Sequence, residues 1–179
     1  MMKMKILLIS DSHHYNDILQ SALDFHQNDV DLKVCCGDTS LTVEDPLIKS
    51  FDYVVKGNHD WDNFPNYTVF QNICLTHGNL YHVYRGYEEL IELCQKENCL
   101  LCFHGHTHVP TIQRHRNITF INPGSLMMNR GSYGYGTYAI VDITNEIHVT
   151  YYHHMTHQPC PDNILIEGRK LLEEFKKII

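Results

Sequence analysis

The chain lacks any long hydrophobic run. Its 179 residues contain no stretch close to the roughly 20 apolar residues that a transmembrane helix requires, which argues against membrane insertion. Residues 1–10 place a basic segment before an apolar one, but only 6–9 are continuously apolar and no small-residue cleavage site follows. This pattern is typical of a first buried strand rather than of a signal peptide, so a cytoplasmic location is expected.

An excess of positive charge is also missing. Lys and Arg number 14 against 21 Asp and Glu, which gives a formal net charge of −7. Non-specific binding of nucleic acid depends on Lys and Arg that neutralise phosphates, so this class of partner is not expected. A small phosphorylated substrate remains compatible with the composition, because metal ions can supply positive charge locally.

The seven cysteines are an odd number, which argues against a disulfide framework when no signal peptide is expected. Cys99 and Cys102 form a C-x-x-C pattern inside an apolar segment. With no second cysteine pair nearby, buried structural thiols are expected there rather than a redox or zinc pair. Histidine is the residue in excess, with 14 copies, and it is the commonest metal ligand.

Apolar periodicity predicts an α/β chain. Residues 4–55 read as strand 4–10, helix 17–27 with Asn16 as N-cap, strand 32–36, a short helix from Asp45-Pro46 and strand 53–55, which favours a parallel sheet. Further strands are expected at 68–70, 73–76, 100–103, 111–114, 118–121, 138–143 and 147–152, and helices at 87–97 and 164–179. No repeat or long linker interrupts this pattern. Residues 1–179 therefore predict a single domain, with helices outside and sheets inside.

Five short polar motifs fall where predicted apolar strands end. They are Asp11-Ser-His13, Gly37-Asp38, Gly57-Asn-His-Asp60, Thr76-His-Gly78 and Gly105-His-Thr-His108. Taken singly, most of them are as typical of a turn or a satisfied polar residue as of a site. Open α/β sheets, however, place their sites at the carboxyl ends of strands. Five such ends in order predict one cluster of Asp, Asn and His side chains.

These residue types suit the hydrolysis of phosphate esters. Two divalent cations about 3.5–4 Å apart can bind the phosphate oxygens and lower the pKa of a water between them. A bridging carboxylate holds the cations close, while imidazole and carboxamide ligands limit the negative charge of the site. Residues i and i+2 at a strand end point to the same side. Asp11 and His13 have this spacing, and so do His106 and His108.

The ordered motifs, followed by Ile121-Asn-Pro-Gly-Ser125, resemble the calcineurin-like metallophosphoesterase superfamily, and specifically its small prokaryotic phosphodiesterase branch. The resemblance covers residues 4–143 and implies a four-layer α/β/β/α sandwich, with two sheets flanked by helices. It also implies the ligand roles: Asp11, His13 and His108 for the first metal, Asn58, His77 and His106 for the second, and Asp38 bridging both.

The resemblance assigns no metal to His59. It implies instead that His59 faces the substrate phosphate and stabilises the transition state or protonates the leaving oxygen, while Asp60 orients the His59 imidazole. The small branch often carries Cys at this position, so a His favours a fully competent site. Asn58, His59 and Arg130, which follows the Asn-Pro-Gly-Ser loop, are the expected substrate contacts.

Other histidines and tyrosines have open assignments. His104 is expected to hydrogen-bond near the ligands, with direct metal ligation as the alternative. His153, His154 and His157 are expected at a solvated strand end, with an extra metal site as the alternative. Tyr133, Tyr135 and Tyr138 lie among glycines and suit either a substrate-side loop or an oligomer contact.

The sequence therefore predicts a dinuclear metal-dependent phosphoesterase, acting on a diester or a monoester through a water that bridges two divalent metals. Mixed nitrogen and oxygen ligation favours a transition metal, Mn above Fe, Zn, Ni or Mg. A homodimer is the default assembly. The alternative function is a protein-binding scaffold of the same fold, as in a eukaryotic endosomal-coat subunit with an eroded metal site.

Overall fold

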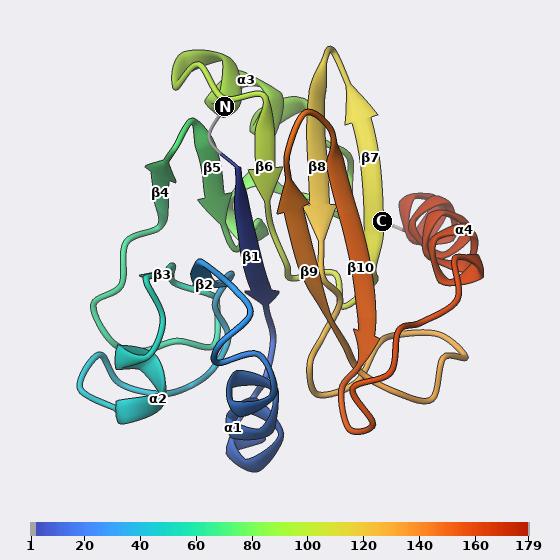
Figure 1. Ribbon diagram of the computed structural model, residues 1–179. Helices are drawn as coiled ribbons and strands as arrows, with labels where there is room; N and C mark the ends of the chain where they lie inside the picture. Colours follow the sequence, from blue (N-terminus) through green and yellow to red (C-terminus); the bar gives the residue numbers. More distant parts are fainter. Residues whose placement is uncertain (1–2, 179) are drawn as a thin grey trace.

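The computed structural model describes residues 3–178 and contains two five-stranded sheets packed face to face (Figure 1). The first sheet has the order β10-β9-β1-β2-β3 and the second has the order β4-β5-β6-β8-β7. The strands are β1 (Met4–Ile9), β2 (Leu32–Cys35), β3 (Tyr53–Val54), β4 (Tyr67–Phe70), β5 (Ile73–Thr76), β6 (Leu101–Phe103), β7 (Thr111–His115), β8 (Ile118–Asn122), β9 (Thr137–Ile143) and β10 (Ile147–His153). The helices are α1 (Asn16–Phe25), α2 (Pro46–Lys49), the 3₁₀ turn η1 (Asn79–Tyr81), α3 (Glu88–Lys96) and α4 (Asn163–Ile178).

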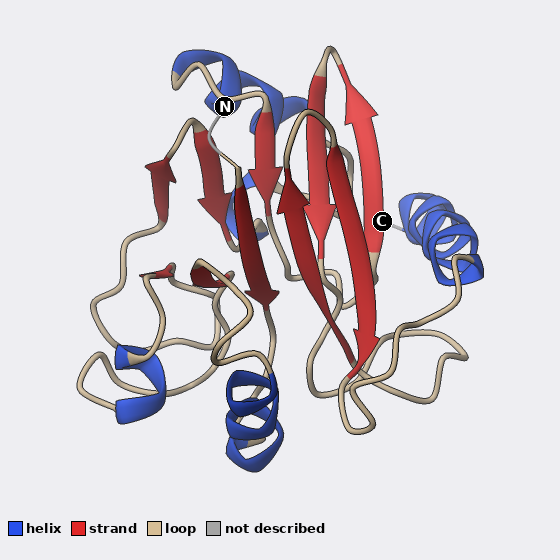
Figure 2. Ribbon diagram, in the orientation of Figure 1, coloured by secondary structure: helices blue, strands red, loops and turns tan. Residues whose placement is uncertain are grey.

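Hydrophobic clusters on three levels define four layers. The central cluster joins the two sheets, for example through Leu8 of β1 and Phe103 of β6. A second cluster packs the outer face of the first sheet against α1 through Leu19. A third packs the outer face of the second sheet against α3 through Leu90. Figure 2 shows the helices outside the sheets, and the predicted α/β/β/α sandwich is confirmed.

Strand β1 shows why its sequence is apolar throughout. Ile6 and Leu8 point into the central cluster, whereas Leu7 and Ile9 point into the cluster with α1. A strand covered on both faces needs an apolar side chain at every position. Strands β1, β2 and β3 are parallel as predicted, but β9 and β10 join antiparallel to them. The complete sheet is therefore mixed.

The two expected helix starts have different outcomes. Asp45 caps α2 as predicted, because its side chain accepts a hydrogen bond from the Leu47 N–H (2.9 Å) and Pro46 opens the helix. The expectation that Asn16 caps the next helix upstream is wrong. Asn16 is the first residue of α1, Tyr15 occupies the N-cap, and no side chain caps that end.

The parallel strands of both sheets end at one side of the molecule. In Figure 1 the arrows of β1, β5 and β6 all point toward the lower end, and β2 and β3 run parallel to β1. The five polar motifs follow these strands directly, so they share one edge of the sandwich.

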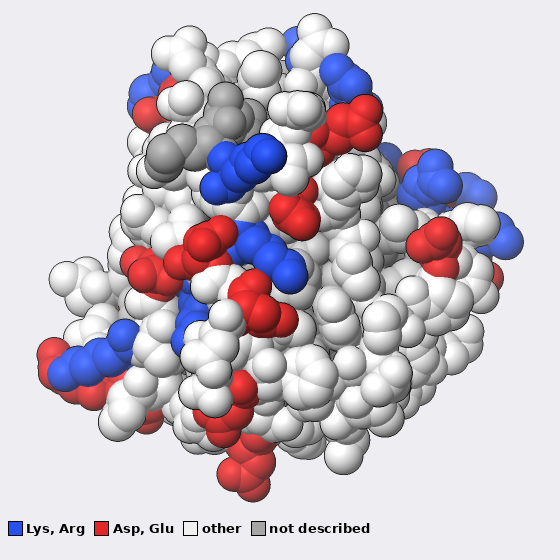
Figure 3. Space-filling model, in the orientation of Figure 1, with Lys and Arg blue, Asp and Glu red and all other residues white. Residues whose placement is uncertain are grey.

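The surface in Figure 3 carries acidic and basic side chains interspersed with uncharged ones, so this face of the molecule has no continuous basic area.

Between residues 3 and 178, no helix combines the length and the apolar character needed to cross a membrane. The expected last helix residue, Ile179, lies outside the described residues.

Candidate metal centre

The loops that carry the predicted ligands have an unusual backbone. Positive φ angles between 43° and 71° occur at Asp11, His13, Asp38, His106 and His108. Non-glycine residues seldom adopt this conformation, which persists only where the surrounding structure holds it. Here the Asp11 N–H donates to the Gly37 carbonyl (3.0 Å) and the His13 N–H donates to the Asp38 carbonyl (3.0 Å). The loops after β1 and β2 therefore fix each other.

A first group of ligand atoms comes from Asp11, His13 and His108, which lie within 4.8 Å of one another. The two histidine Nε2 atoms are 3.1 Å apart. Asp11 Oδ1 lies 3.1 Å from the Nε2 of His108 and 3.5 Å from that of His13. These are the three residues that the resemblance assigns to the first metal, and the fold brings them together.

A second group forms around His77, the buried histidine at the end of β5. Its Nε2 lies 3.2 Å from Asp38 Oδ2 and 3.1 Å from Asn58 Oδ1. Its Nδ1 is 2.7 Å from the Cys36 carbonyl, to which it donates, leaving Nε2 free to bind a cation. Asp38 Oδ2 is also 3.8 Å from His13 Nε2, so Asp38 lies between the two groups.

His106, the remaining predicted ligand, stands at the edge of the second group. Its ring centroid is 5.1 Å from that of His77. Burial, together with the nearby His77, lowers the pKa of His106 to about 4, which keeps this imidazole neutral. The second sheet therefore supplies His106 in the protonation state that metal binding requires.

One oxygen of Asp11 provides a direct test of whether a cation fits. Asp11 Oδ2 accepts hydrogen bonds from Ser10 Oγ (2.5 Å) and from the His106 N–H (3.1 Å). Asp11 Oδ1 is fully buried and has no hydrogen-bond donor among residues 3–178, although an unsatisfied buried acceptor is costly. A divalent cation between Oδ1 and the neighbouring imidazoles would satisfy it, so the residues present fit the metal that the motifs imply.

The pKa values of Asp11 and His77 also support a cation at this place. Burial opposes charge on Asp11, but His77 and the adjacent imidazoles of His108 and His13 keep its pKa well below the usual value. Burial likewise opposes protonation of His77, yet the charges of Asp11 and Asp38 raise the pKa of His77 to about 9. A site that holds a proton so tightly has a deficit of positive charge, which a cation can fill.

Two glycines are required beside these carboxylates. A Cβ at Gly57 would overlap Asp38 Oδ1, and a Cβ at Gly105 would overlap Ser10 Oγ and lie 2.6 Å from Asp11 Oδ2. No side chain larger than hydrogen can occupy these positions without displacing a predicted ligand.

Asp60 has a different task from the one expected. Its Oδ2 accepts from the N–H groups of Asp38 and Gly57 (2.7 Å each), and its Oδ1 accepts from those of Thr39 (3.1 Å) and Ser40 (2.9 Å). Both oxygens are thus used by the backbone, and the predicted orientation of the His59 imidazole by Asp60 is wrong. Asp60 instead positions the loop that carries Asp38.

His59 lies at the mouth of the site. Its side chain is exposed, and its ring packs edge-on against His13 with centroids 5.3 Å apart. Its backbone N–H donates to Asp38 Oδ1 (2.8 Å). The imidazole is outside both ligand groups, next to them and open to solvent.

Arg130 and Tyr84 border the His106–His108 loop. The Arg130 N–H donates to the His108 carbonyl (2.9 Å) and its Nε donates to the Thr107 carbonyl (3.1 Å). The Tyr84 ring lies 5.2 Å from the His106 ring and 6.0 Å from the Arg130 guanidinium. Sequence reasoning missed Tyr84, because a single tyrosine outside the motifs carries no recognisable signal.

The Asn-Pro-Gly-Ser loop at the end of β8 is hydrogen-bonded to two of the loops that carry the predicted ligands. Ser125 Oγ donates to the Asp11 carbonyl (2.9 Å), and Asn122 Nδ2 donates to Thr107 Oγ1 (2.9 Å). The loop therefore joins the end of β1 to the last histidine motif.

The remaining histidines lie away from the ligand groups. His104 is fully buried and bonds to the Tyr87 hydroxyl (2.8 Å) and the Gly105 carbonyl (3.1 Å). The expected solvated cluster near residue 155 is wrong for two of its members. His154 is buried on the Leu126 carbonyl (2.6 Å), and His157 is buried against the hydroxyl of Tyr138 (2.7 Å).

Two facing sheets with clustered Asp and His side chains on their strand-end loops define an α/β/β/α sandwich with a candidate metal centre. A sequence profile of the calcineurin-like phosphoesterase superfamily domain matches residues 4–146. The probable metallophosphoesterase YsnB of Bacillus subtilis is 31% identical over 149 residues, which cover 80% of this chain and 86% of YsnB. The chain therefore belongs to the calcineurin-like phosphoesterase superfamily, a family of metal-dependent phosphoesterases, as the motifs predicted.

Solved structures agree with this assignment. A predicted phosphoesterase from Streptococcus pneumoniae aligns with a TM-score of 0.82 and 32% identity over 90% of this chain and 95% of its own. Vps29 of Entamoeba histolytica, solved in complex with Zn²⁺, aligns with a TM-score of 0.69 and 18% identity over 88% of this chain and 96% of its own. Likeness at this lower identity shows a shared fold alone.

Proposed function

We propose that this protein hydrolyses an ester bond in a small phosphorylated substrate, using a water activated between two divalent cations. The observation that carries the proposal is the buried Asp11 Oδ1, which has no hydrogen-bond donor in the described part of the chain and lies 3.1 Å and 3.5 Å from the Nε2 atoms of His108 and His13. A buried carboxylate oxygen surrounded by imidazole nitrogens suits a cation better than any donor that this chain offers.

Seven residues would hold the two ions. Asp11, His13 and His108 would bind one, and Asn58, His77 and His106 would bind the other. Asp38 would be shared, and its Oδ2 distances of 3.8 Å to His13 and 3.2 Å to His77 support that role. The ions would polarise the phosphoryl oxygens and supply an activated water.

His59 would act on the substrate. Its exposed imidazole borders the ligand groups without joining either one, so it can reach a phosphate bound there. In its protonated form it would stabilise charge on the phosphoryl oxygens or donate a proton to the leaving oxygen. Arg130, with an exposed guanidinium anchored through Nε, and Asn58 would help hold the phosphate.

Manganese is the proposed metal. The donors are imidazole nitrogens together with carboxylate and carboxamide oxygens, and this mixture favours a transition metal over Mg²⁺. Fe, Zn and Ni share the preference, so metal analysis of the purified protein is the first check.

The test measures hydrolysis of bis-p-nitrophenyl phosphate and p-nitrophenyl phosphate by metal-stripped protein before and after Mn²⁺ is added. Activity that Mn²⁺ restores, and that is lost in Asp38→Asn, supports the proposal, and the ratio of the two rates reports diester or monoester preference. His59→Ala should lose turnover while binding the same amount of metal. His148→Ala is the matched control, since His148 is exposed on β10, lies opposite Asp142 in the strand register at the end of the sheet away from the site, and has Glu146 as its charged neighbour (3.9 Å).

The alternative is a protein-binding scaffold of the same fold. The solved Vps29 structures support a shared architecture, but nothing in the ligand set of this chain is eroded. Normal metal binding without turnover on either ester would favour the scaffold.

A further inference from the structure

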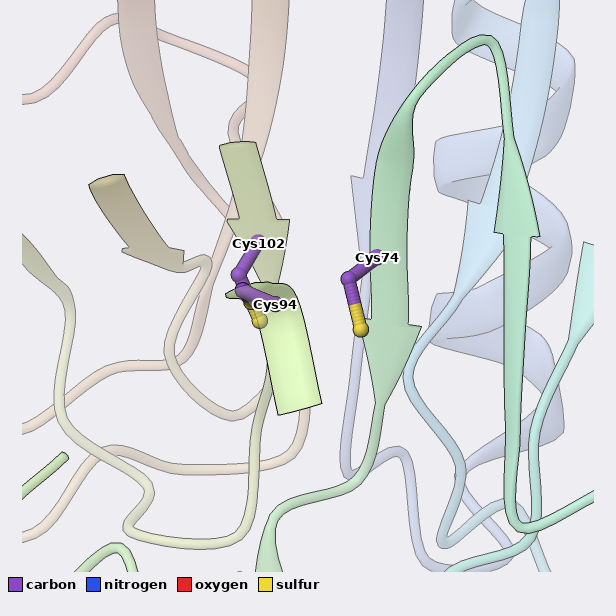
Figure 4. A group of neighbouring side chains, drawn as sticks. All are labelled: Cys74, Cys94 and Cys102. Atoms are coloured by element: carbon purple, nitrogen blue, oxygen red, sulfur yellow. The ribbon is translucent and has the colours of Figure 1, made fainter. Parts of the chain in front are cut away.

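Three thiols meet between α3 and the second sheet, away from the metal centre. Cys74 comes from β5, Cys102 from the neighbouring β6, and Cys94 from α3 (Figure 4). Their sulfur atoms lie within 4.8 Å of one another, and all three residues are fully buried. Cys99 and Cys102 are buried thiols, as predicted. A metal site was not expected there because no second cysteine pair is near in the sequence, but the fold brings Cys74 and Cys94 close to Cys102.

Strand pairing and the packing of α3 explain why the three cysteine side chains meet. Cys74 and Cys102 are directly paired across the parallel strands β5 and β6. Their sequence neighbours, such as Leu75 and Phe103, point into the core between the sheets, so both cysteines point to the opposite face, which α3 covers. Cys94 is on the buried side of α3, four residues after Leu90.

We propose that Cys74, Cys94 and Cys102 form a binding site for a soft, thiophilic metal ion, for which Cu(I) is the best fit. A trigonal ion with metal–sulfur bonds of about 2.3 Å holds its three sulfurs about 4 Å apart. The observed limit of 4.8 Å is close to this spacing, and small side-chain rotations would close the difference.

The donor set selects the ion. Sulfur ligands prefer Cu(I) and Zn²⁺ over Mn²⁺ or Mg²⁺. Closed zinc sites have four ligands, and the described residues place no fourth cysteine, histidine or carboxylate in this group. Cu(I) is satisfied by two or three sulfurs, so it can bind while one thiol stays protonated. That limits the net charge placed in an apolar interface, where charge is costly.

Cys99 marks the outer end of the same interface. It belongs to the same hydrophobic cluster and is nearly fully buried, but its thiol points to the Glu97 carbonyl (3.6 Å) and lies outside the ligand group. The next residue, Leu100, is 63% exposed. Cys99→Ser is therefore the matched control for the three proposed ligands.

An ion at this place would link strands that lead into the metal centre. Cys74 precedes His77 by three residues, and Cys102 precedes His106 by four. Occupancy would tie α3 to both strands and stabilise the second sheet. The site uses only sulfur, however, so its existence does not depend on the proposed hydrolysis.

The experiment titrates fully reduced, metal-stripped protein with Cu(I) without oxygen, in competition with the chromophoric chelator bicinchoninate. We expect one tightly bound Cu(I) per chain and an X-ray absorption spectrum with sulfur neighbours alone. Cys94→Ser and Cys102→Ser should each weaken binding by about tenfold or more, while Cys99→Ser and Cys160→Ser should bind as the wild type does.

Other results would overturn the assignment. Nitrogen or oxygen neighbours in the spectrum would place the copper at the Asp and His centre instead. Equal affinity in all variants, or no Cu(I) retained against the chelator, would show that the three cysteines are core residues only. Because a serine in β6 can disturb folding, Cys94→Ala on the helix provides a second variant, and near-ultraviolet circular dichroism of each protein confirms its packing before titration.

Discussion

Replacing Asp60 by Asn separates a structural role for this residue from a catalytic one. The carboxylate accepts four backbone hydrogen bonds of 2.7–3.1 Å and is 4% exposed. An Asn amide has one oxygen, so two of the four N–H groups would face an NH₂ donor. Asp60→Asn should therefore destabilise the loop at 38–40 rather than change the chemistry of His59.

The expected loss of stability follows from these contacts. A buried N–H left without an acceptor costs about 1–3 kcal/mol, so two of them cost about 2–6 kcal/mol. The two remaining hydrogen bonds also weaken, because they no longer reach a charged acceptor. We expect a loss of about 4 kcal/mol in the free energy of unfolding, against about 5–15 kcal/mol for a typical domain.

Urea unfolding of the metal-free protein measures this loss, since bound metal would add its own stabilisation. The control is Asp62→Asn in the same loop. Asp62 also accepts two backbone hydrogen bonds, from Val43 (2.7 Å) and Asn63 (2.8 Å), but it is near the surface and should leave the midpoint close to that of the wild type. A stability change below about 1 kcal/mol combined with a loss of turnover at saturating metal would refute this reasoning and return Asp60 to a catalytic role.

Three further changes test other parts of the structure. Gly57→Ala should reduce the metal bound per chain, because its Cβ overlaps the carboxylate of Asp38; elemental analysis checks this. Metal binding should release the proton that His77 holds with a pKa of about 9. The affinity for metal should therefore rise about tenfold per pH unit up to that pH. Calorimetry in buffers of different ionisation enthalpy would count the released proton. Tyr138→Phe should cost about 1–3 kcal/mol in unfolding experiments, since its buried hydroxyl serves two buried histidines. Tyr152→Phe is its control, as Tyr152 is only partly buried and stacks on Tyr138 through its ring.

The sequence predicted the layers and the ligand set for a shared physical reason. Strands buried on both faces must be apolar throughout, so β5 was predicted with the bounds observed, Ile73–Thr76. A polar residue directly after such a strand is then conspicuous. Asp11, Asp38 and His77 were found in this way, and the parallel direction of their strands brought them to one edge.

The errors concern residues whose role depends on contacts distant in the sequence. The Asn16 N-cap was wrong because the site loop sets the start of α1: the His14 N–H is bound to the Thr39 carbonyl (3.2 Å) and the Asn16 N–H to the His14 carbonyl (2.9 Å). His154 looks solvated in a polar segment, yet the loop at Leu126 covers it.

The mixed first sheet has the same origin. The alternation of strands and helices in the first third of the chain predicts parallel pairing correctly for β1, β2 and β3. The local sequence of β9 does not indicate that this strand pairs antiparallel with β1. The partner of β9 depends on which edge of the sheet is unpaired, and this is a property of the whole fold.

An intact ligand set does not by itself separate an enzyme from a scaffold, because either could retain bound metal. The side chain of His59 is the more informative feature. It is outside the two ligand groups, it is exposed, and its ring packs edge-on against that of His13. The proposed metal ligation uses no imidazole at this position, whereas the proposed proton donation to the leaving oxygen does. Loss of turnover in His59→Ala, with unchanged metal content and unfolding midpoint, is therefore what a hydrolase predicts and a scaffold does not.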